Sequence, residues 1–321
     1  MTPARHAALA CAVLLSACSA DDTRPAPSTD GGRLDGTSLP NALTLELVAE
    51  KKLSKLLSTK DVDHYEASGI VASSGKLYVA SDNSTRIAVI DTALDEGELG
   101  PGDAGDSQYE AITASDDGRF FTTVESDSDT NGPAQVAELD TDAAFVRKSS
   151  TDVSFEHANK GFEGVAWLRV AGQEYLLALC ENNDCEDDDS PPGEGRAQLL
   201  TRVNDIWTTR IRLKLPKSVA FINYSDLALA SNGDGTYRAL VVSRKSSAIW
   251  IGTLTTSPWA FTGPSAFYTF PRSADGSVRY CSVEGITFLG PDVLAAVSDK
   301  SDDSKPCSDE EESIHVFQVP R

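Results

Sequence analysis

Five acidic residues recur along the chain, each at or near the start of a short apolar run. They are Glu66, Glu110, Glu163, Asp226 and Glu284, separated by 44, 53, 63 and 58 residues. Carboxylate oxygens suit Ca²⁺ or Mg²⁺, whereas zinc prefers histidine and cysteine ligands. If the five side chains converge, their like charges raise one another's pKa unless a cation or backbone N–H groups offset them. The pattern therefore predicts either a divalent-cation site, with Ca²⁺ as its ion, or carboxylates that hold backbone amides without a metal.

Each of these acids opens a unit of three short apolar runs. The runs are roughly four to eight residues long, rich in Val, Ile, Leu, Tyr and Phe, and bounded by Gly, Asn, Asp and Ser. Such runs indicate strands, because none keeps a helical period for three turns. Repetition at this period, with three or four strands per unit, is typical of a β-propeller. If each inner strand begins near the axis, the five carboxylates meet at one mouth of the central tunnel.

The two ends of the chain favour a ring that is closed by an N-terminal strand. The fifth unit stops just after its third strand, while residues 42–50 form an alternating strand ahead of the first unit. A terminal strand that completes the last blade removes an exposed sheet edge. We therefore expect an all-β β-propeller of five blades, or of six if residues 94–108 or 146–159 form a degenerate one. A β-sandwich is the alternative fold, but it does not explain the recurring acid.

A second acidic pattern has the spacing of a 12-residue calcium loop. Asp127, Asp129 and Asn131 precede Gly132, and Glu138 follows five residues later, where a bidentate carboxylate is expected. The flanking segments are predicted strands, so the usual helix pair is missing. An Asx-rich hairpin turn with an outward-facing Glu138 is the alternative.

The N-terminal segment has the features of a lipoprotein signal peptide. Arg5 precedes an apolar run over residues 7–17, which is too short to span a bilayer and leads into Leu-Ser-Ala-Cys at Cys18. This lipobox order predicts that residues 1–17 are removed and that the Cys18 thiol carries the lipid that attaches the protein to a membrane. An ordinary secretory signal cleaved nearby is the alternative.

Residues 18–40 are rich in Pro, Gly, Ser and Asp and have almost nothing to bury, so we expect a flexible tether. The β-propeller domain then spans residues 41–321. The protein is expected in the cell envelope, exported and lipid-anchored. Ser19, in place of the aspartate that retains lipoproteins in an inner membrane, favours the outer membrane where the cell has one.

Four cysteines remain after cleavage and lipidation: Cys180, Cys185, Cys281 and Cys307. An even count in an exported protein suggests two disulfides. Of the three possible pairings, the local one is favoured, Cys180 with Cys185 and Cys281 with Cys307, because each pair lies within one unit. The spacing does not match a zinc site.

Nucleophilic catalysis finds no support in the sequence, which has no G-x-S-x-G motif and no recognisable partner spacing for its histidines. His64 and His157 precede two of the recurring acids and are the candidates for a general base at the tunnel mouth. His315 lies inside a predicted strand, where a packed or surface histidine is expected.

The net charge of −21, from 49 Asp and Glu against 28 Lys and Arg, disfavours binding to nucleic acid or to anionic lipid through a basic face. Cations and cationic partners remain, and we expect a monomer.

The repeated units carry a resemblance to known families. With E-G or S-G opening the inner strand and S-D-N or E-N-N closing the next, residues 42–319 resemble the SdiA-regulated and esterase-like phytase groups of bacterial propeller proteins. The resemblance implies that the recurring acids match those that hold a metal on the axis of calcium-dependent phytases and gluconolactonase-like propellers. A dense set of basic residues for a polyphosphate is missing, which disfavours phytate hydrolysis. The basic residues near the ends that could surround such a site are Arg86, Lys160, Arg244, Lys245 and Lys300.

Two functions follow from these observations. The first is a ligand- or partner-binding protein of the cell envelope with an axial divalent-cation site. The alternative is a calcium-dependent hydrolase of phosphoester or lactone type, in which one of the acids, or His157, activates water.

Overall fold

The computed structural model describes residues 39, 41–57, 63–102, 108–125, 132–155, 161–181, 185, 193, 195–300 and 310–320. The chain divides into two units, residues 1–31 and 32–321, and every described residue belongs to the second. Several predicted residues lie outside the described part, namely Cys18, Asp127, Asp129, Asn131, His157 and Cys307.

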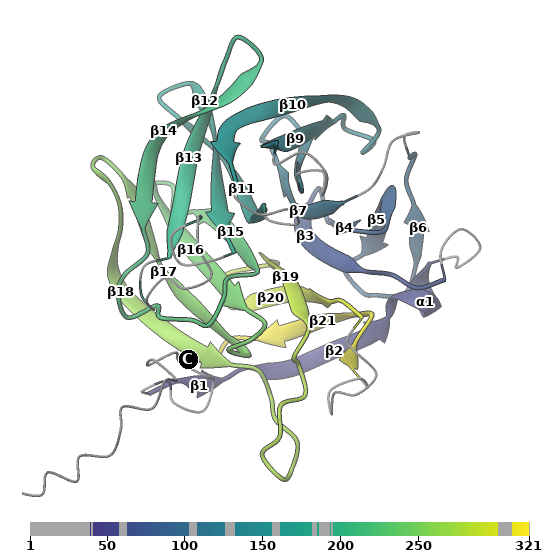
Figure 1. Cartoon of the computed structure of the whole chain (residues 1–321). Coiled ribbons are helices and arrows are strands. Elements are labelled where there is room, and N and C mark those ends of the chain that lie inside the picture. The colour runs from purple at the N-terminus through teal and green to yellow at the C-terminus, as the bar shows by residue number, and fades with distance from the viewer. Residues whose placement is uncertain are drawn as a thin grey trace, which may run out of the picture. The chain divides into compact units, whose positions relative to one another are not determined.

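The described strands form four sheets, of five, eight, four and four strands (Figure 1). The eight-stranded sheet consists of two antiparallel four-stranded units, so five repeating units can be distinguished. The first unit contains β3 (Ala67–Ser73), β4 (Lys76–Ser81), β5 (Ser84–Asp91) and β6 (Gly97–Leu99). The second contains β7 (Tyr109–Ala114), β8 (Phe120–Val124), β9 (Pro133–Leu139) and β10 (Phe145–Ser154). The third contains β11 (Phe162–Val170), β12 (Gln173–Cys180), β13 (Arg196–Val203) and β14 (Ile206–Lys214). A parallel contact between β10 and β14 joins the second and third units at their outer strands.

The last two units incorporate strands from the start of the described chain. The fourth contains β15 (Asp226–Ser231), β16 (Thr236–Ser243), β17 (Ala248–Thr256) and β18 (Trp259–Thr269), with β1 (Leu43–Thr44) parallel to β18. The fifth contains β19 (Val283–Phe288), β20 (Val293–Ser298), β21 (Ser313–Gln318) and β2 (Glu46–Lys52). A single turn of helix, α1 (Leu53–Leu56), follows β2.

The first strands of the five units form a closed ring around the centre. Strand β3 packs against β7, β7 against β11, β11 against β15, β15 against β19, and β19 against β3, as Figure 1 shows. This arrangement confirms the all-β propeller prediction. The two stretches that were candidates for a sixth unit are residues 94–108 and 146–159. They contain β6 and most of β10, which are the fourth strands of the first two units.

An N-terminal strand closes the ring, as predicted. Strand β2 pairs antiparallel with β21, so that Glu50 lies opposite His315. His315 is fully buried, and burial lowers the pKa of its imidazole, which is therefore neutral near pH 7. Its Nδ1 donates to the Glu50 carboxylate at 2.8 Å, and its Nε2 accepts from the Ser298 hydroxyl at 2.8 Å. One imidazole thus joins β2, β20 and β21.

Glycines allow the inner strands to approach one another closely. A Cβ atom on Gly164 would lie 2.5 Å from the backbone nitrogen of Leu227, and one on Gly285 would lie 2.8 Å from the Cα of Gly69. Neighbouring inner strands are also joined through side chains, since Thr113 Oγ1 accepts from the Trp167 N–H at 2.9 Å. The glycine in each E-G pair is therefore required by the packing of the next unit.

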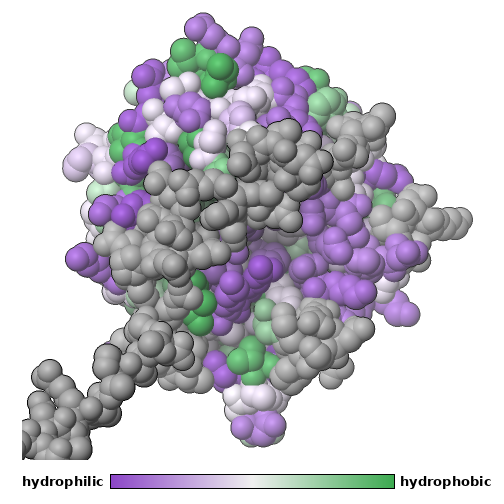
Figure 2. Space-filling view, viewed as in Figure 1, coloured by the Kyte–Doolittle hydropathy of each residue, from purple (hydrophilic) through white to green (hydrophobic). Residues whose placement is uncertain are grey.

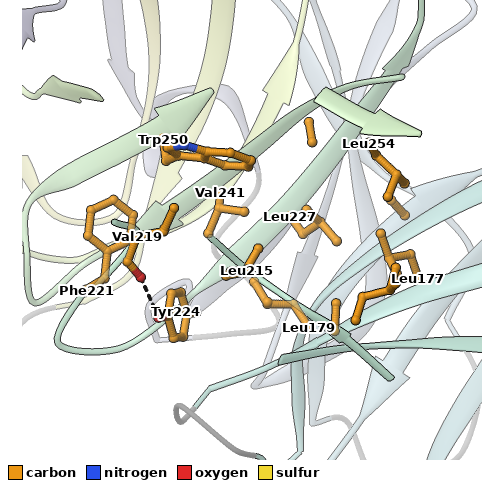
Figure 3. Close-up of a cluster of buried hydrophobic side chains, with 14 of the residues drawn as sticks. Leu177, Leu179, Leu215, Val219, Phe221, Tyr224, Leu227, Val241, Trp250 and Leu254 are labelled. Carbon is orange, nitrogen blue, oxygen red and sulfur yellow. Dashed lines mark hydrogen bonds between the residues drawn. The ribbon is translucent and has the colours of Figure 1, made fainter. Parts of the chain in front are cut away.

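Apolar side chains fill the space between adjacent units. Figure 3 shows the cluster formed by the third and fourth units, in which Leu177 and Leu179 of β12 face Leu227 and Val241. Tyr224 lies in the same cluster and donates its hydroxyl hydrogen to the Val219 carbonyl at 2.8 Å. The alternating apolar residues of the strands supply this core, while the polar residues at the strand ends are left for the mouth of the ring.

Cys180 and Cys185 form the predicted disulfide. Cys281 is also disulfide-bonded, and its partner lies outside the described residues. A disulfide indicates an oxidising, extracytoplasmic environment. Among the helices that the structure describes, none is long and apolar enough to cross a membrane.

The close approach of the inner strands predicts the effect of two matched substitutions. Gly164→Ala places a methyl group against the backbone of the next unit, and overpacking of this kind costs about 1–3 kcal/mol. Gly290→Ala is the control, because a Cβ atom there meets nothing within 4 Å, and its effect should stay within about 0.5 kcal/mol. Urea denaturation measures both, and equal stabilities of the two variants would contradict the packing argument.

Candidate functional site

Charged side chains line a cavity of about 250 Å³ at one mouth of the ring. In Figure 2, hydrophilic residues gather around the middle of the face, where the surface is hollowed. Eight carboxylates, one guanidinium and one hydroxyl line the cavity, which we call the acidic pocket. Its residues are Glu66, Ser68, Asp82, Glu110, Glu125, Glu163, Glu181, Arg244, Glu284 and Asp299.

A β-bulge in the inner strand aims a first set of carboxylates into the pocket. The pairing of inner and second strands shifts by one residue at Glu110, at Glu163 and at Glu284. A bulged residue has no partner across the ladder, and its side chain is re-aimed. The same shift in the first unit falls at Ser68, so a serine replaces the acid there. Glu66, two residues before Ser68 in the chain, also lines the pocket.

The residue that directly follows the second strand of each unit supplies a second set. In order along the chain these residues are Asp82, Glu125, Glu181, Arg244 and Asp299. The acids among them are absent from the predicted site. In the sequence these residues belong to the polar cluster that ends each second apolar run. The clusters support the prediction of a repeat, but their acids are not among the predicted site residues.

Asp226 is the one recurring acid that does not line the pocket. Its carboxyl group is buried and accepts from the backbone N–H of Leu227 at 2.7 Å and of Ile286 at 2.8 Å. Burial raises its pKa well above the ordinary value, although these two hydrogen bonds act in the opposite direction. The Asp226 side chain therefore joins β15 to β19. This is the role expected of a recurring acid that holds backbone amides without a metal. Ser225, which directly precedes Asp226, is hydrogen-bonded to the pocket acid Glu284.

Glu138, the last residue of the predicted calcium loop, lies in β9 among three arginines. Its carboxylate accepts from Arg119 Nη1 at 2.9 Å, from Arg147 Nε at 2.8 Å and from Arg202 Nη1 at 2.9 Å. Burial alone would raise its pKa, but these hydrogen bonds lower it to about 2. Both carboxylate oxygens are thus occupied by cationic donors.

Glu110 and Glu163 face other carboxylates across the pocket. Burial raises the pKa of both well above the ordinary value, and nearby carboxylates raise it further. The carboxylate with the largest effect on Glu110 is Glu163, and the one with the largest effect on Glu163 is Glu181. Among the described residues, no hydrogen bond to either carboxylate offsets this repulsion, and the charge of Arg244 acts against it at Glu163.

The other side of the pocket is partly neutralised. Arg244 forms an ion pair with Glu284, and its Nη2 lies 4.0 Å from Glu181 Oε1. Burial nevertheless raises the pKa of Glu284. Burial, followed by the charge of Glu284, raises the pKa of Asp299 to about 7. The Asp299 carboxyl group therefore titrates near neutral pH.

His64 is the predicted general-base candidate that the structure describes near the pocket. Its Nε2 lies 2.6 Å from Glu66 Oε1. His315 is instead enclosed at the β2 closure, away from solvent. Among the described residues, the acidic hydrogen-bond partner of His64 is Glu66, and that of His315 is Glu50.

The donor set of the acidic pocket suits a hard cation, because all its anionic ligands are oxygen. Among the described residues, no three His, Cys, Asp or Glu side chains are close enough together to hold a metal directly. The cavity of about 250 Å³ has room for an ion with several water molecules, since a water molecule takes roughly 30 Å³ in the liquid. The geometry therefore fits a hydrated ion better than a bare one.

No protein-family model matches the sequence, and no curated protein matches it. Solved structures that share its fold include the following two. A GH43 β-xylosidase/α-arabinofuranosidase from a compost microbial metagenome is 13% identical with a TM-score of 0.53, and covers 87% of this chain and 96% of its own. The glutaminyl cyclase of Myxococcus xanthus is 11% identical with a TM-score of 0.51, and covers 87% of this chain and 98% of its own. At these identities the likeness supports the propeller fold alone.

The raised pKa values predict how stability depends on pH in calcium-free buffer. A carboxyl group whose pKa is higher in the folded state binds more protons when folded, so its ionisation favours unfolding. The stability that these groups contribute is fully present below the ordinary carboxyl pKa and is lost as pH rises through the raised pKa of each group, which is about 7 for Asp299. Glu163→Gln removes one of them, so its melting temperature should fall less than that of the wild type between pH 5 and pH 8.

The difference between the pH profiles of Glu163→Gln and the wild type reports on the pocket alone. His315 and Glu138 are present in both proteins, so their contributions to the pH dependence cancel. Differential scanning calorimetry gives the two pH profiles. Parallel profiles would show that Glu163 does not experience the electrostatic repulsion assigned to it.

Proposed function

We propose that this protein is a binding protein whose acidic pocket takes up a hydrated divalent cation, with Ca²⁺ as the first candidate. The observation that supports the proposal most is the pair Glu110 and Glu163, two carboxylates without a hydrogen-bond donor of their own among the described residues, in a pocket of like charges. A cation in the pocket offsets this repulsion and lets the carboxylates ionise.

The pocket lining favours an inorganic ion over an organic cation. No aromatic side chain is among the described residues that line it, so a quaternary ammonium group finds no ring face to bind. Carboxylates and water are the ligands that calcium and magnesium prefer. Calcium is the better candidate of the two, because it accepts irregular coordination and variable numbers of ligands.

We further propose that the protein acts in the cell envelope, attached through lipid on Cys18 and, where the cell has one, on the outer membrane. The lipobox order of the sequence supports the anchor, and the oxidising environment indicated by the disulfide agrees with export. The resemblance to SdiA-regulated and esterase-like phytase propellers belongs to this proposal as well. The net charge of −21 argues against nucleic acid as a partner, and a monomer is sufficient to form the pocket.

A calcium-dependent hydrolase of phosphoester or lactone type is the second candidate. One observation favours it, the Asp299 carboxyl group with a pKa of about 7 at the pocket wall, which suits a general base for water near neutral pH. Calcium-dependent turnover of a lactone or phosphomonoester that is lost in Asp299→Asn would place this function first. Calcium binding without turnover of either substrate would instead favour the proposed binding protein.

Calcium should raise the melting temperature of the wild-type protein. A ligand present at 100 times its dissociation constant stabilises the folded state by about 2.7 kcal/mol. Glu110→Gln and Glu163→Gln should each reduce the rise strongly, because an amide keeps the shape but loses the charge that attracts a divalent ion. Thermal unfolding in EDTA and in millimolar calcium measures the effect.

Glu46→Gln is the matched control, since it removes an exposed carboxylate on the outer strand β2. This variant should keep the full calcium-dependent rise. A wild-type protein whose melting temperature does not respond to millimolar calcium or magnesium would rule out the cation site.

A further inference from the structure

The acidic pocket already contains one cation that belongs to the chain. The Arg244 guanidinium forms an ion pair with Glu284 and lies 4.0 Å from Glu181. Its side chain is 37% exposed, whereas that of Glu284 is 11% exposed. Arg244 therefore lines the pocket and still has an open side toward solvent. It is the one basic side chain among the described residues that line the cavity.

The position of Arg244 is the one at which the other units place an acid. The residue after the second strand is Asp82, Glu125, Glu181 or Asp299 in those units. Arg244 thus replaces a negative charge with a positive one at the equivalent place in its unit. Two hydrogen bonds fix the backbone beside it, from Arg244 N–H to Ser225 Oγ at 3.2 Å and from Lys245 N–H to Asn223 Oδ1 at 3.2 Å.

We propose that Arg244 is a tethered competitor for the cation that the pocket binds. The inference rests on the proposed function, because it concerns the affinity of the same site. Without a bound ion, the guanidinium neutralises Glu284. A divalent ion that binds these carboxylates displaces the guanidinium toward solvent through its open side.

Competition of this kind sets the concentration at which the pocket fills. Arginine stays protonated at every physiological pH, so the competitor is removed only by displacement and not by titration. A tethered charge competes at constant local concentration, which lowers the apparent affinity for the free ion. The pocket then fills at ion concentrations higher than its eight carboxylates alone require.

Two variants separate competition from a general effect of charge. Arg244→Gln removes the guanidinium from the pocket, and Lys245→Gln removes an equal charge from the next residue, whose side chain is exposed. Calorimetric titration with calcium should show a dissociation constant at least about tenfold lower for Arg244→Gln, and a change of less than about twofold for Lys245→Gln. In EDTA, Arg244→Gln should have a lower melting temperature than the wild type, because Glu284 loses its counter-charge, and calcium should restore it.

Arg244→Lys keeps the experiment decisive if Arg244→Gln does not fold. Lysine retains the charge but cannot contact two carboxylates through a planar fork, so its calcium affinity should fall between those of the wild type and of a protein without the charge. Equal affinities of the wild type and both Arg244 variants, or equal gains in Arg244→Gln and Lys245→Gln, would overturn the competition. Tighter calcium binding by Arg244→Gln alone would support it.

The outcomes also separate this inference from the proposed function. If the wild type binds calcium and Arg244→Gln binds it no better, the competition is wrong and the cation site stands. If no variant binds calcium or magnesium, the proposed function fails, and the competition fails with it.

Discussion

Closure of the ring forces like charges together. Five inner strands meet at distances that only glycine or a small residue allows at the points of contact, as at Gly164 and Gly285. The backbone positions from which the carboxylates at the mouth project are therefore fixed relative to one another. Pairing of β2 with β21, fixed by the buried imidazole of His315, holds the ring shut and with it the repulsion among the acids. The electrostatic character of the pocket is thus a consequence of backbone packing.

A buried carboxylate, Glu138, and a partly buried one, Glu163, show how strongly nearby hydrogen-bond donors affect the pKa. Both residues lie in strands, Glu138 in β9 and Glu163 in β11. Three arginines hydrogen-bond to Glu138, and its pKa falls to about 2. Glu163 faces other acids with one arginine nearby, and its pKa rises well above the ordinary value. The first environment is complete without a ligand, whereas the second gains from a cation, which is why the pocket and not the Glu138 cluster is the candidate site.

The repeats made most of the fold predictable, because each unit buries alternate residues of similar strands and the terminal strand shows the same alternation in its sequence. Glu110, Glu163 and Glu284 were predictable for the same reason. Glu66 and Asp226 do not occupy the position in the inner strand that Glu110, Glu163 and Glu284 occupy. The β-bulge at that position depends on how two strands pair, and the pairing register is not visible in the sequence of one strand. In the first unit the bulge falls at Ser68 instead of at the predicted Glu66, and in the fourth unit Ser225 and not the predicted Asp226 contacts a pocket acid. The second set, such as Asp82 and Asp299, was missed because a charged residue after a strand is common in turns, and only the closed ring brings these turns to one mouth.

The central claim is that a hydrated divalent cation occupies the acidic pocket. Crystals grown without divalent ions and then soaked in strontium, which scatters anomalously and substitutes for calcium, locate the ion directly. The account predicts one anomalous peak among Glu110, Glu163 and Glu284, surrounded by water density. A strontium peak elsewhere on the protein with none in the pocket, or no ordered peak at all, would contradict it.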